Sequence, residues 1–245
     1  MRSITLITGE SRGIGAQTAK ACAEAGHILA INYNVNEHAA QSVAADIRAG
    51  GGTALIVRAN VAIESDVVAM FDFILEKFGR ITGLVNNAGI HGPHGRVESL
   101  SNMDITIVLE INVRGYFLCA REAIQHMSTN HGGRGGGIVN VSFGSAHFGD
   151  PGCGVIYAAS KGAVNSLTIG LSQEVAGEGI RVNTVAPGIT ETDMPPKDKL
   201  ANAHTLILMG RPGQPDGVAA AILWLLSNKS GYVAGANIRV AGGCL

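Results

Sequence analysis

Near the N-terminus the chain reads Ile4-Thr5-Leu6-Ile7-Thr8-Gly9-Glu10-Ser11-Arg12-Gly13-Ile14-Gly15. The run Ile4–Thr8 predicts a buried strand, and the glycines predict a sharp turn into a helix. Glycine lets backbone N–H groups come close to an anion, and the N-terminus of a helix carries partial positive charge. This order favours a nucleotide phosphate site, and a tight turn without a ligand is the alternative.

Short β-rich runs alternate with helical patterns along the rest of the chain. Such alternation is typical of a parallel sheet covered by helices on both faces. We expect strands at Ile4–Thr8, Ile28–Tyr33, Ala54–Arg58, Gly83–Asn86, Gly137–Ser142, Arg181–Ala186 and Asn237–Val240. We expect helices at Gly13–Ala25, Glu37–Ala49, Ile63–Phe78, Ser101–Met127, Tyr157–Ala176 and Asp216–Leu226. The predicted fold class is therefore α/β, with about seven parallel strands in one domain over residues 1–245.

The composition argues against several classes of protein. Of the 245 residues 46% are hydrophobic and 15% are charged, and the formal net charge is -1. We expect no nucleic-acid partner, because no excess of positive charge is present to neutralise phosphates, and the apolar content argues against disorder. The apolar stretch Val218–Leu226 has about half the length of a membrane span. We therefore expect a core helix there and no membrane partner.

Cysteine and histidine spacing gives no sign of a metal or a disulfide framework. The four cysteines are widely separated, at Cys22, Cys119, Cys153 and Cys244, and no His-Glu-x-x-His pattern occurs. The sequence therefore predicts no metal, and it favours a solvated loop over substrate contact for His91 and His94. The chain enters its first strand too early for a signal peptide, so we expect a cytoplasmic protein.

The segment Ile189–Gly213 interrupts the regular alternation. It contains three prolines and no clean strand pattern. Ligands of open α/β sheets bind beyond the carboxyl ends of the strands, and this segment follows the strand Arg181–Ala186. We expect a mobile insertion that covers the substrate.

Six motifs, in this order, resemble the short-chain dehydrogenase/reductase family in its compact single-domain form. They are Thr8-Gly-x-x-x-Gly13-Ile-Gly15, Asn86-Asn87-Ala88-Gly89, Asn112, Tyr157-Ala-Ala-Ser-Lys161, Pro187-Gly188 and the closing Ala241-Gly242-Gly243. The resemblance covers nearly the whole chain. It implies a Rossmann-type doubly wound sheet and an oxidoreductase acting on a CH–OH group, which moves a hydride between a nicotinamide and a small carbonyl or alcohol.

The resemblance also implies which residues bind the cofactor. Family members that use NAD carry an acidic residue at the end of the second strand, whereas this chain has Asn32, Tyr33 and Asn34 and no carboxylate before Glu37. Arg12 stands where NADP-dependent members carry a phosphate-binding arginine, so NADP(H) is favoured over NAD, with a solvated loop cation as the alternative. The residues implied are Gly9, Ser11, Arg12, Gly13, Ile14, Gly15, Tyr33, Asn34, Asn60, Val61, Asn87, Ala88, Gly89, Tyr157, Lys161, Pro187, Gly188, Thr190 and Thr192.

Several of these positions have a plainer interpretation. Asn60 stands where the family has an aspartate that contacts adenine, and its amide can still form a hydrogen bond. For Asn86, pinning of neighbouring strands is the favoured interpretation. Thr190 and Thr192 resemble residues that hold the nicotinamide carboxamide, and ordinary turn hydroxyls are the alternative.

Tyr157 and Lys161 are four residues apart and therefore share one face of a helix. By resemblance, Tyr157 donates or accepts the proton, and Lys161 lowers the pKa of the phenol and binds the ribose. Asn112 resembles the residue that holds a water in a proton relay, with a buried structural asparagine as the alternative.

The chain departs from the family in Val141-Ser142-Phe143-Gly144-Ser145. Aligned from Ile138, Phe143 occupies the position of the catalytic serine, and phenylalanine cannot donate a hydrogen bond. We expect Ser145 to substitute, because in an extended chain it has the parity of Phe143, with Ser142 in reserve. A nucleotide-binding protein with weak or no catalysis is the alternative function, against which Tyr157, Lys161 and Asn112 argue.

Similar family members are usually homotetramers. They pair through two long helices, which correspond here to Ser101–Met127 and Tyr157–Ala176. We therefore expect a homo-oligomer, a tetramer or a dimer, that acts on a small-molecule substrate.

Overall fold

A seven-stranded parallel sheet forms the centre of the structure, in the order β3-β2-β1-β4-β5-β6-β7. The structure is a computed structural model that describes residues 2–9, 12–195 and 200–244. Its strands are β1 Ile4–Ile7, β2 Ile28–Tyr33, β3 Thr53–Arg58, β4 Gly83–Asn86, β5 Gly136–Val141, β6 Ile180–Pro187 and β7 Asn237–Val240. The seven predicted strands are confirmed, with ends that differ by no more than one residue.

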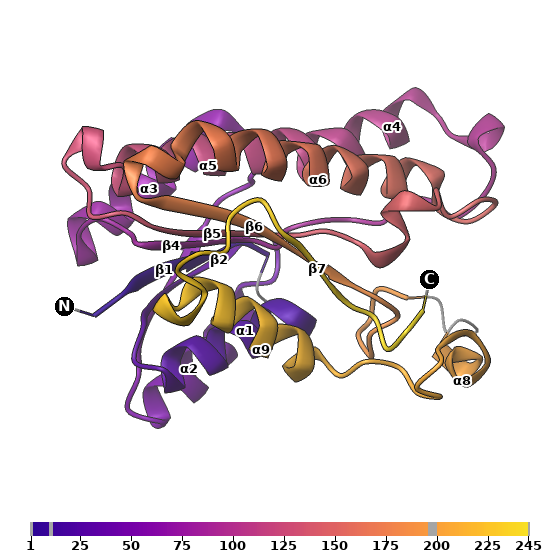
Figure 1. Cartoon of the computed structure of the whole chain (residues 1–245), viewed down its shortest axis with the longest axis horizontal. Coiled ribbons are helices and arrows are strands. Elements are labelled where there is room, and N and C mark those ends of the chain that lie inside the picture. Colours follow the sequence, from indigo (N-terminus) through magenta and orange to yellow (C-terminus); the bar gives the residue numbers. More distant parts are fainter. Residues whose placement is uncertain (1, 10–11, 196–199, 245) are drawn as a thin grey trace.

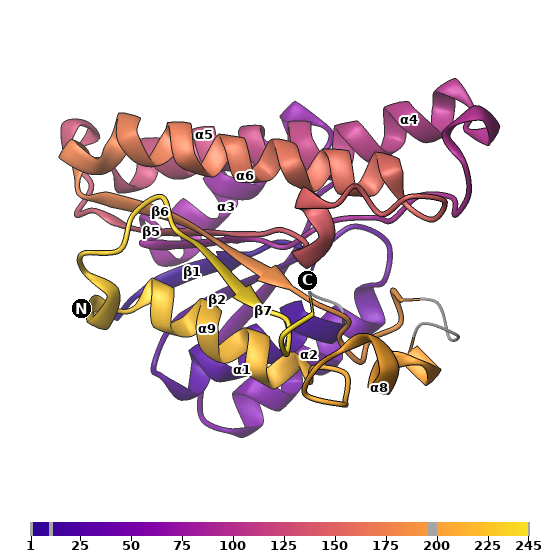
Figure 2. The same ribbon diagram turned by 45° about the vertical axis from the view of Figure 1, so that its right-hand side comes forward.

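Helices cover both faces of this sheet, as predicted. Figures 1 and 2 show α1 (Gly13–Glu24), α2 (Glu37–Ala49) and α9 (Pro215–Leu226) on one face. The other face carries α3 (Glu64–Phe78), α5 (Gly115–Met127) and α6 (Val155–Val175). The helix α4 (Asn102–Leu109) and the short α8 (Ala203–Leu206) lie toward the end of the sheet at which β7 ends.

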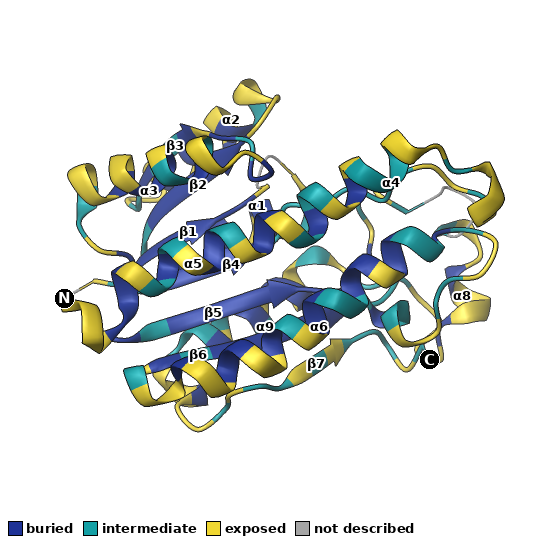
Figure 3. Ribbon diagram, turned by 90° about the horizontal axis from the view of Figure 1, so that it is seen from above, coloured by how far each residue is buried: buried dark blue, intermediate teal, exposed yellow. Residues whose placement is uncertain are grey.

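Alternate residues of the strands face opposite layers of helices. Leu6, Leu84, Ile138 and Val182 join the core under α3, α5 and α6, whereas Ile7, Val85, Val139 and Val185, at positions of the opposite parity in the same strands, join the core under α1, α2 and α9. The strands β1, β2, β4, β5 and β6 are therefore dark blue along most of their length in Figure 3, whereas the edge strand β7 is not. Each fully buried aliphatic side chain contributes roughly 1.5–3 kcal/mol to folding. Because alternate side chains of a strand point to opposite faces of the sheet, the same strands stabilise both helical layers.

The predicted continuous helix Ser101–Met127 is wrong, because a π-helical turn at Glu110–Arg114 separates α4 from α5. Ser101 starts α4 with a capping box shared with Asp104. The interruption occurs at Asn112, whose side chain bonds to the backbone of Ile90. Single-turn π-helices of this kind are frequent at functional sites.

A chain of buried polar side chains ties the centre of the sheet to α6. Asn86 donates to Asn140 opposite it in register (2.9 Å), and Asn140 donates to Thr168 of α6 (2.9 Å). Thr184 of β6 donates to the same hydroxyl at 2.7 Å. Asn86 therefore pins strands together, in agreement with the favoured interpretation.

The strand order reverses between β1 and β4, because the chain builds outward from β1 to β3 and then returns to β4 on the other side. The loops after these two strands leave in opposite directions, which opens a crevice at their carboxyl ends.

None of the helices in the described ranges combines the length and the apolar character that crossing a membrane requires.

Candidate active site

The first glycine turn is fastened to the end of β4. The hydroxyl of Thr8 accepts hydrogen bonds from the N–H groups of Asn87 and Ala88, both at 3.1 Å. In return, the Asn87 amide donates to the carbonyls of Thr8 and Gly9 at 3.0 Å. Gly9 has φ +71°, and a Cβ there would lie 2.5 Å from Cα of Ala88. Only glycine fits this position, because the two backbones touch.

Asn32 holds the same turn from the other side, a role that sequence analysis missed. Its buried side chain donates to the Ala59 carbonyl (3.0 Å) and accepts from the N–H of Gly9 (3.4 Å). The signal was available, since an amide inside an otherwise apolar strand must find partners.

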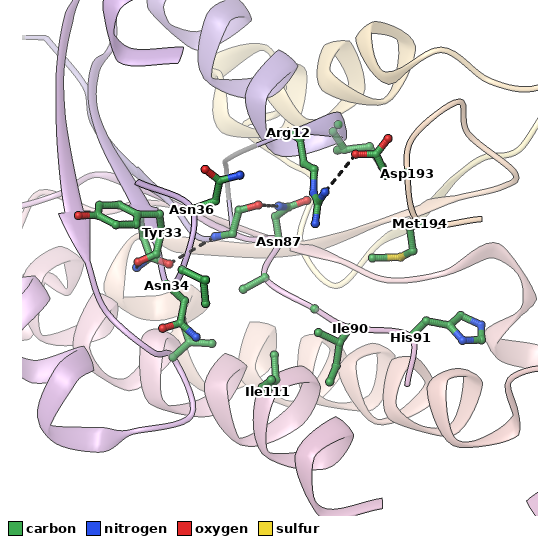
Figure 4. A pocket seen from close by; sticks show the side chains of 18 of the residues that line it. Arg12, Tyr33, Asn34, Asn36, Asn87, Ile90, His91, Ile111, Asp193 and Met194 are labelled. Carbon is green, nitrogen blue, oxygen red and sulfur yellow. Dashed lines mark hydrogen bonds and ion pairs between the residues drawn. The ribbon is translucent and has the colours of Figure 1, made fainter. Parts of the chain in front are cut away.

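A cavity of about 590 Å³ extends from this turn past the ends of β2, β3 and β4. In Figure 4, Tyr33, Asn34 and Asn36 lie at one end of it, and His91 and Met194 lie at the other. The predicted cofactor-binding residues that line it are Gly9, Arg12, Gly13, Ile14, Tyr33, Asn34, Asn60, Val61, Asn87, Ala88, Gly89 and Thr192. Ser11 lies outside the described residues, and Gly15 is buried in the first turn of α1 and is not among the residues that line this cavity.

The charges of this cavity suit an anion near the glycine turn. Asp193 is the only carboxylate among the described residues that line it, and it lies 3.2 Å from Nη1 of Arg12 (Figure 4). Glu37 is not among the lining residues. The pKa of Tyr33 is raised, first by burial and then by the charge of Glu37. Asn60 uses its side-chain oxygen to accept from the N–H of Ala62 at 3.1 Å, which leaves its NH₂ group for another partner.

A second cavity of about 530 Å³ adjoins the first and shares six lining residues with it, Ile14, Asn87, Gly89, His91, Thr192 and Met194. Its further lining includes the predicted site residues Ser142, Ser145, Tyr157, Lys161, Pro187, Gly188 and Thr190, whereas Asn112 lines neither cavity. From the predicted insertion, Ile189, Met194, Pro195 and Leu206 contribute side chains to its wall. The Thr190 hydroxyl donates to the Gly188 carbonyl at 3.0 Å, as an ordinary turn hydroxyl does.

Tyr157 and Lys161 lie near the start of α6, and both are buried. Lys161 Nζ donates to the hydroxyl of Tyr116 (2.9 Å) and to the carbonyl of Val141 (2.8 Å). Burial without a carboxylate lowers the pKa of Lys161 to about 7. Burial, and to a lesser extent the charge of Asp150, raises the pKa of Tyr157. The expected lowering of the Tyr157 pKa is therefore wrong for the protein without its cofactor.

Asn112 uses its whole side chain to hold the π-helical turn. Its oxygen accepts from the N–H of Ile90 (2.9 Å), and its NH₂ group donates to the Ile90 carbonyl (2.8 Å) and to Ser160 (3.0 Å). A Cβ at Gly89 would lie 3.2 Å from this oxygen and 3.5 Å from Lys161 Nζ. Asn112 thus fixes the floor beside Lys161, where glycine keeps the space open.

The three candidate residues at the end of β5 have different surroundings. Ser142 is buried and donates to the carbonyl of Lys161 at 3.1 Å, which joins β5 to α6. The ring of Phe143 packs against that of Tyr157, with centroids 5.1 Å apart. Ser145 also lines the second cavity. The parity argument for it is wrong, because the chain leaves the extended conformation at Gly144 and enters a 3₁₀ turn over Gly144–His147.

A second ring packs on Tyr157. The imidazole of His91 is nearly parallel to the phenol, at 27° and 4.9 Å between centroids, and it lines both cavities. The prediction of a solvated loop is wrong for His91, which is half-buried, whereas His94 is exposed. Sequence analysis could not foresee this contact, because it depends on how the loop after β4 meets α6.

Comparisons with known proteins agree with this arrangement. A family model described as Enoyl-(Acyl carrier protein) reductase matches residues 9–244. The uncharacterized oxidoreductase YgfF of Escherichia coli is 48% identical, covering 98% of this chain and 99% of that one. A 3-oxoacyl-[acyl-carrier-protein] reductase of Synechocystis is 37% identical, covering 98% and 96%. A crystal structure of a short-chain dehydrogenase from Burkholderia cenocepacia in complex with NADP has a TM-score of 0.91 at 34% identity, covering 98% and 97%.

The buried amine predicts an unusual dependence of stability on pH. The pKa of Lys161 is about 7 in the folded chain against 10.5 ordinarily, so between these values the unfolded chain binds a proton that the folded chain lacks. The free energy of unfolding should rise with pH over this interval, with Lys161 adding at most about 1.4 kcal/mol per pH unit. In Lys161→Met this contribution should vanish, which urea unfolding without cofactor would measure.

The control is Lys229→Met, because Lys229 is exposed. Its free energy of unfolding should depend on pH as that of the wild type does. Equal slopes for wild type and Lys161→Met would contradict the prediction.

Proposed function

The chain belongs to the short-chain dehydrogenase/reductase family, and we propose that it is an NADP(H)-dependent oxidoreductase acting on a small carbonyl or alcohol. The observation that carries this proposal is the pair of adjoining cavities, one beside the glycine turn and one beside Tyr157. The residues that line the first cavity would hold the dinucleotide, and those that line the second would contact the substrate. The nicotinamide supplies or accepts the hydride, and the protein supplies orientation and the proton.

Preference for NADP(H) is supported by the charges near the glycine turn. A 2′-phosphate would compete with Asp193 for Arg12, whose guanidinium offers forked donors to phosphate oxygens. At the end of β2, Tyr33 and Asn34 carry no charge that would repel the phosphate. The Burkholderia relative is described in complex with NADP, which agrees with this preference.

Tyr157 is the proposed acid and base. Its hydroxyl contacts Sδ of Met194 at 3.7 Å, so the phenol reaches the part of the second cavity that the predicted insertion lines. Burial favours the protonated phenol, which suits a proton donor to a carbonyl being reduced. Lys161 lies in the same cavity, and we propose that it binds the ribose and brings the Tyr157 pKa down once the cofactor is present.

We propose that residues 189–213 cover the substrate and that residues 1–245 form one NAD(P)-binding domain. Support comes from Ile189, Met194, Pro195 and Leu206, which line the cavity beside Tyr157. With Phe143 unable to donate, Ser145 is the proposed donor to the substrate oxygen. No disulfide joins Cys22, Cys119, Cys153 or Cys244 within the described residues, which fits the proposed location in the reducing cytoplasm.

Replacing Tyr157 should remove turnover without removing the cofactor. We expect purified protein to oxidise NADPH with at least one compound of a carbonyl panel that includes 3-oxoacyl thioesters, aldehydes and ketones. Tyr157→Phe should lower that rate by about 10²–10⁴-fold, because the proton donor is lost. Its affinity for NADPH, followed by cofactor fluorescence, should change little.

The matched control is Tyr232→Phe, since Tyr232 is fully exposed. It should retain wild-type turnover. Tight NADPH binding without turnover on any compound would instead favour the alternative, a nucleotide-binding protein that lacks catalysis because Phe143 occupies the position of the catalytic serine.

Arg12→Ala should weaken NADPH selectively. Loss of a charged hydrogen bond to the phosphate costs about 1.5–3 kcal/mol, or roughly a 10- to 100-fold rise in the Kd for NADPH. The Kd for NADH should not change, because NADH lacks the phosphate. Arg2→Ala, at the opposite end of β1, is the control, and an equal loss for both cofactors would refute the assignment.

A homotetramer is proposed from an apolar face on α5 and α6. A groove there is lined by Ala120, Ile124, Leu167 and Leu171, and the nearby ring of Phe117 is half exposed. Light scattering should give a mass near four times 25.2 kDa, or twice that value for a dimer. A mass near 25.2 kDa would refute assembly.

A further inference from the structure

We propose that His91, His94 and Cys153 form a binding site for a zinc-class divalent cation at the rim of the second cavity. Their ligand atoms all lie within 4.8 Å of one another. Nδ1 of His94 is 3.4 Å from Sγ of Cys153. In a tetrahedral zinc site with bonds of 2.0–2.3 Å, neighbouring ligand atoms are roughly 3.3–3.8 Å apart. Shifts of about 1 Å would therefore close the set around an ion.

The ring of His91 is oriented as a ligand should be. Its Nδ1 lies 3.3 Å from the Gly92 carbonyl, which can only accept, so the tautomer protonated at Nδ1 would donate there and use Nε2 as the ligand atom. Nε2 is 3.9 Å from a carboxylate oxygen of Asp150, which adds negative charge beside the site. A Cβ at Gly154 would lie 2.6 Å from Nε2 and 2.8 Å from that oxygen. Glycine therefore keeps this space clear.

The backbone holds the two contributing loops together. Gly95 pairs with Gly154 in an isolated β-bridge, and the N–H of Gly95 donates to the Cys153 carbonyl at 3.1 Å. Asp150 is the one non-glycine residue of the described chain with a positive φ, at 45°, a conformation that persists only where surrounding contacts impose it. The rings of His91 and His94 stack with centroids 4.1 Å apart. The three ligands thus come from two loops that backbone contacts hold together.

The donor set selects the ion. Two imidazoles and a thiolate suit zinc and other borderline cations, whereas calcium and magnesium need sets of oxygen ligands. Three protein ligands leave one position for water. The sequence contains no spacing motif that predicts the site, because Cys153 is 59 positions from His94. A cation there would lie beside the imidazole that packs on Tyr157, at the entrance to the proposed reaction cavity.

Cobalt provides a direct test, because it replaces zinc and reports its ligands by absorbance. Protein freed of metal with a chelator should bind one Co²⁺ per chain, with a near-ultraviolet charge-transfer band from the thiolate that Zn²⁺ abolishes. Cys153→Ser should lose the band, and His94→Ala should bind at least 10-fold more weakly. Cys244→Ser and His131→Ala, a second half-exposed thiol and a second exposed imidazole, should bind as the wild type does.

Thermal unfolding separates loss of the site from loss of the fold. Zn²⁺ should raise the wild-type Tm, because an ion that binds only the folded chain stabilises it. It should not raise the Tm of Cys153→Ser or His94→Ala, whose values without metal should match the wild type. Absence of the charge-transfer band, or Zn²⁺ stabilisation that survives Cys153→Ser, would overturn the proposal. Neither result depends on NADPH oxidation, so the site and the enzymatic function are tested separately.

Discussion

The contact on which the site depends is the approach of two backbones, at Gly9 after β1 and Ala88 after β4. No side chain fits between them, and the distance is fixed by reciprocal hydrogen bonds of Thr8 and Asn87. Because the strand order reverses here, the same contact forms the inner end of the crevice. Moving either strand would separate the glycine turn from Gly89, and with it from the floor of the reaction cavity.

The surroundings of Tyr157 combine packed rings with an amine, that of Lys161, whose pKa is lowered by burial. Phe143 and His91 both pack on the phenol, and Lys161 directs its hydrogen bonds to Tyr116 and Val141. In this environment both Tyr157 and Lys161 favour their neutral forms relative to water. Burial in the protein without cofactor therefore opposes the charged form of both groups.

Much of the fold could be predicted because strands and helices leave regular patterns. The strand ends agree within one residue, since alternation of buried side chains is local information. The interruption at Asn112 was not predicted, because it depends on the backbone of Ile90, which is 22 positions away. Likewise, Ser145 does not follow the alternation of an extended strand, because a 3₁₀ turn begins at Gly144. Side-chain partners from distant loops, such as Asp193 for Arg12 and Cys153 for His94, leave no periodic trace.

The ion pair between Arg12 and Asp193 joins residues 181 positions apart in the wall of the first cavity. Asp193 precedes Met194, which touches the Tyr157 hydroxyl. An anion that draws Arg12 from Asp193 and a ligand that displaces Met194 would act on adjacent residues, and any coupling between the two binding events must be reciprocal, each changing the affinity for the other by the same factor. The order in which the two ligands bind would not change the final equilibrium, and the affinity for one ligand, measured with and without the other, would give the coupling between them.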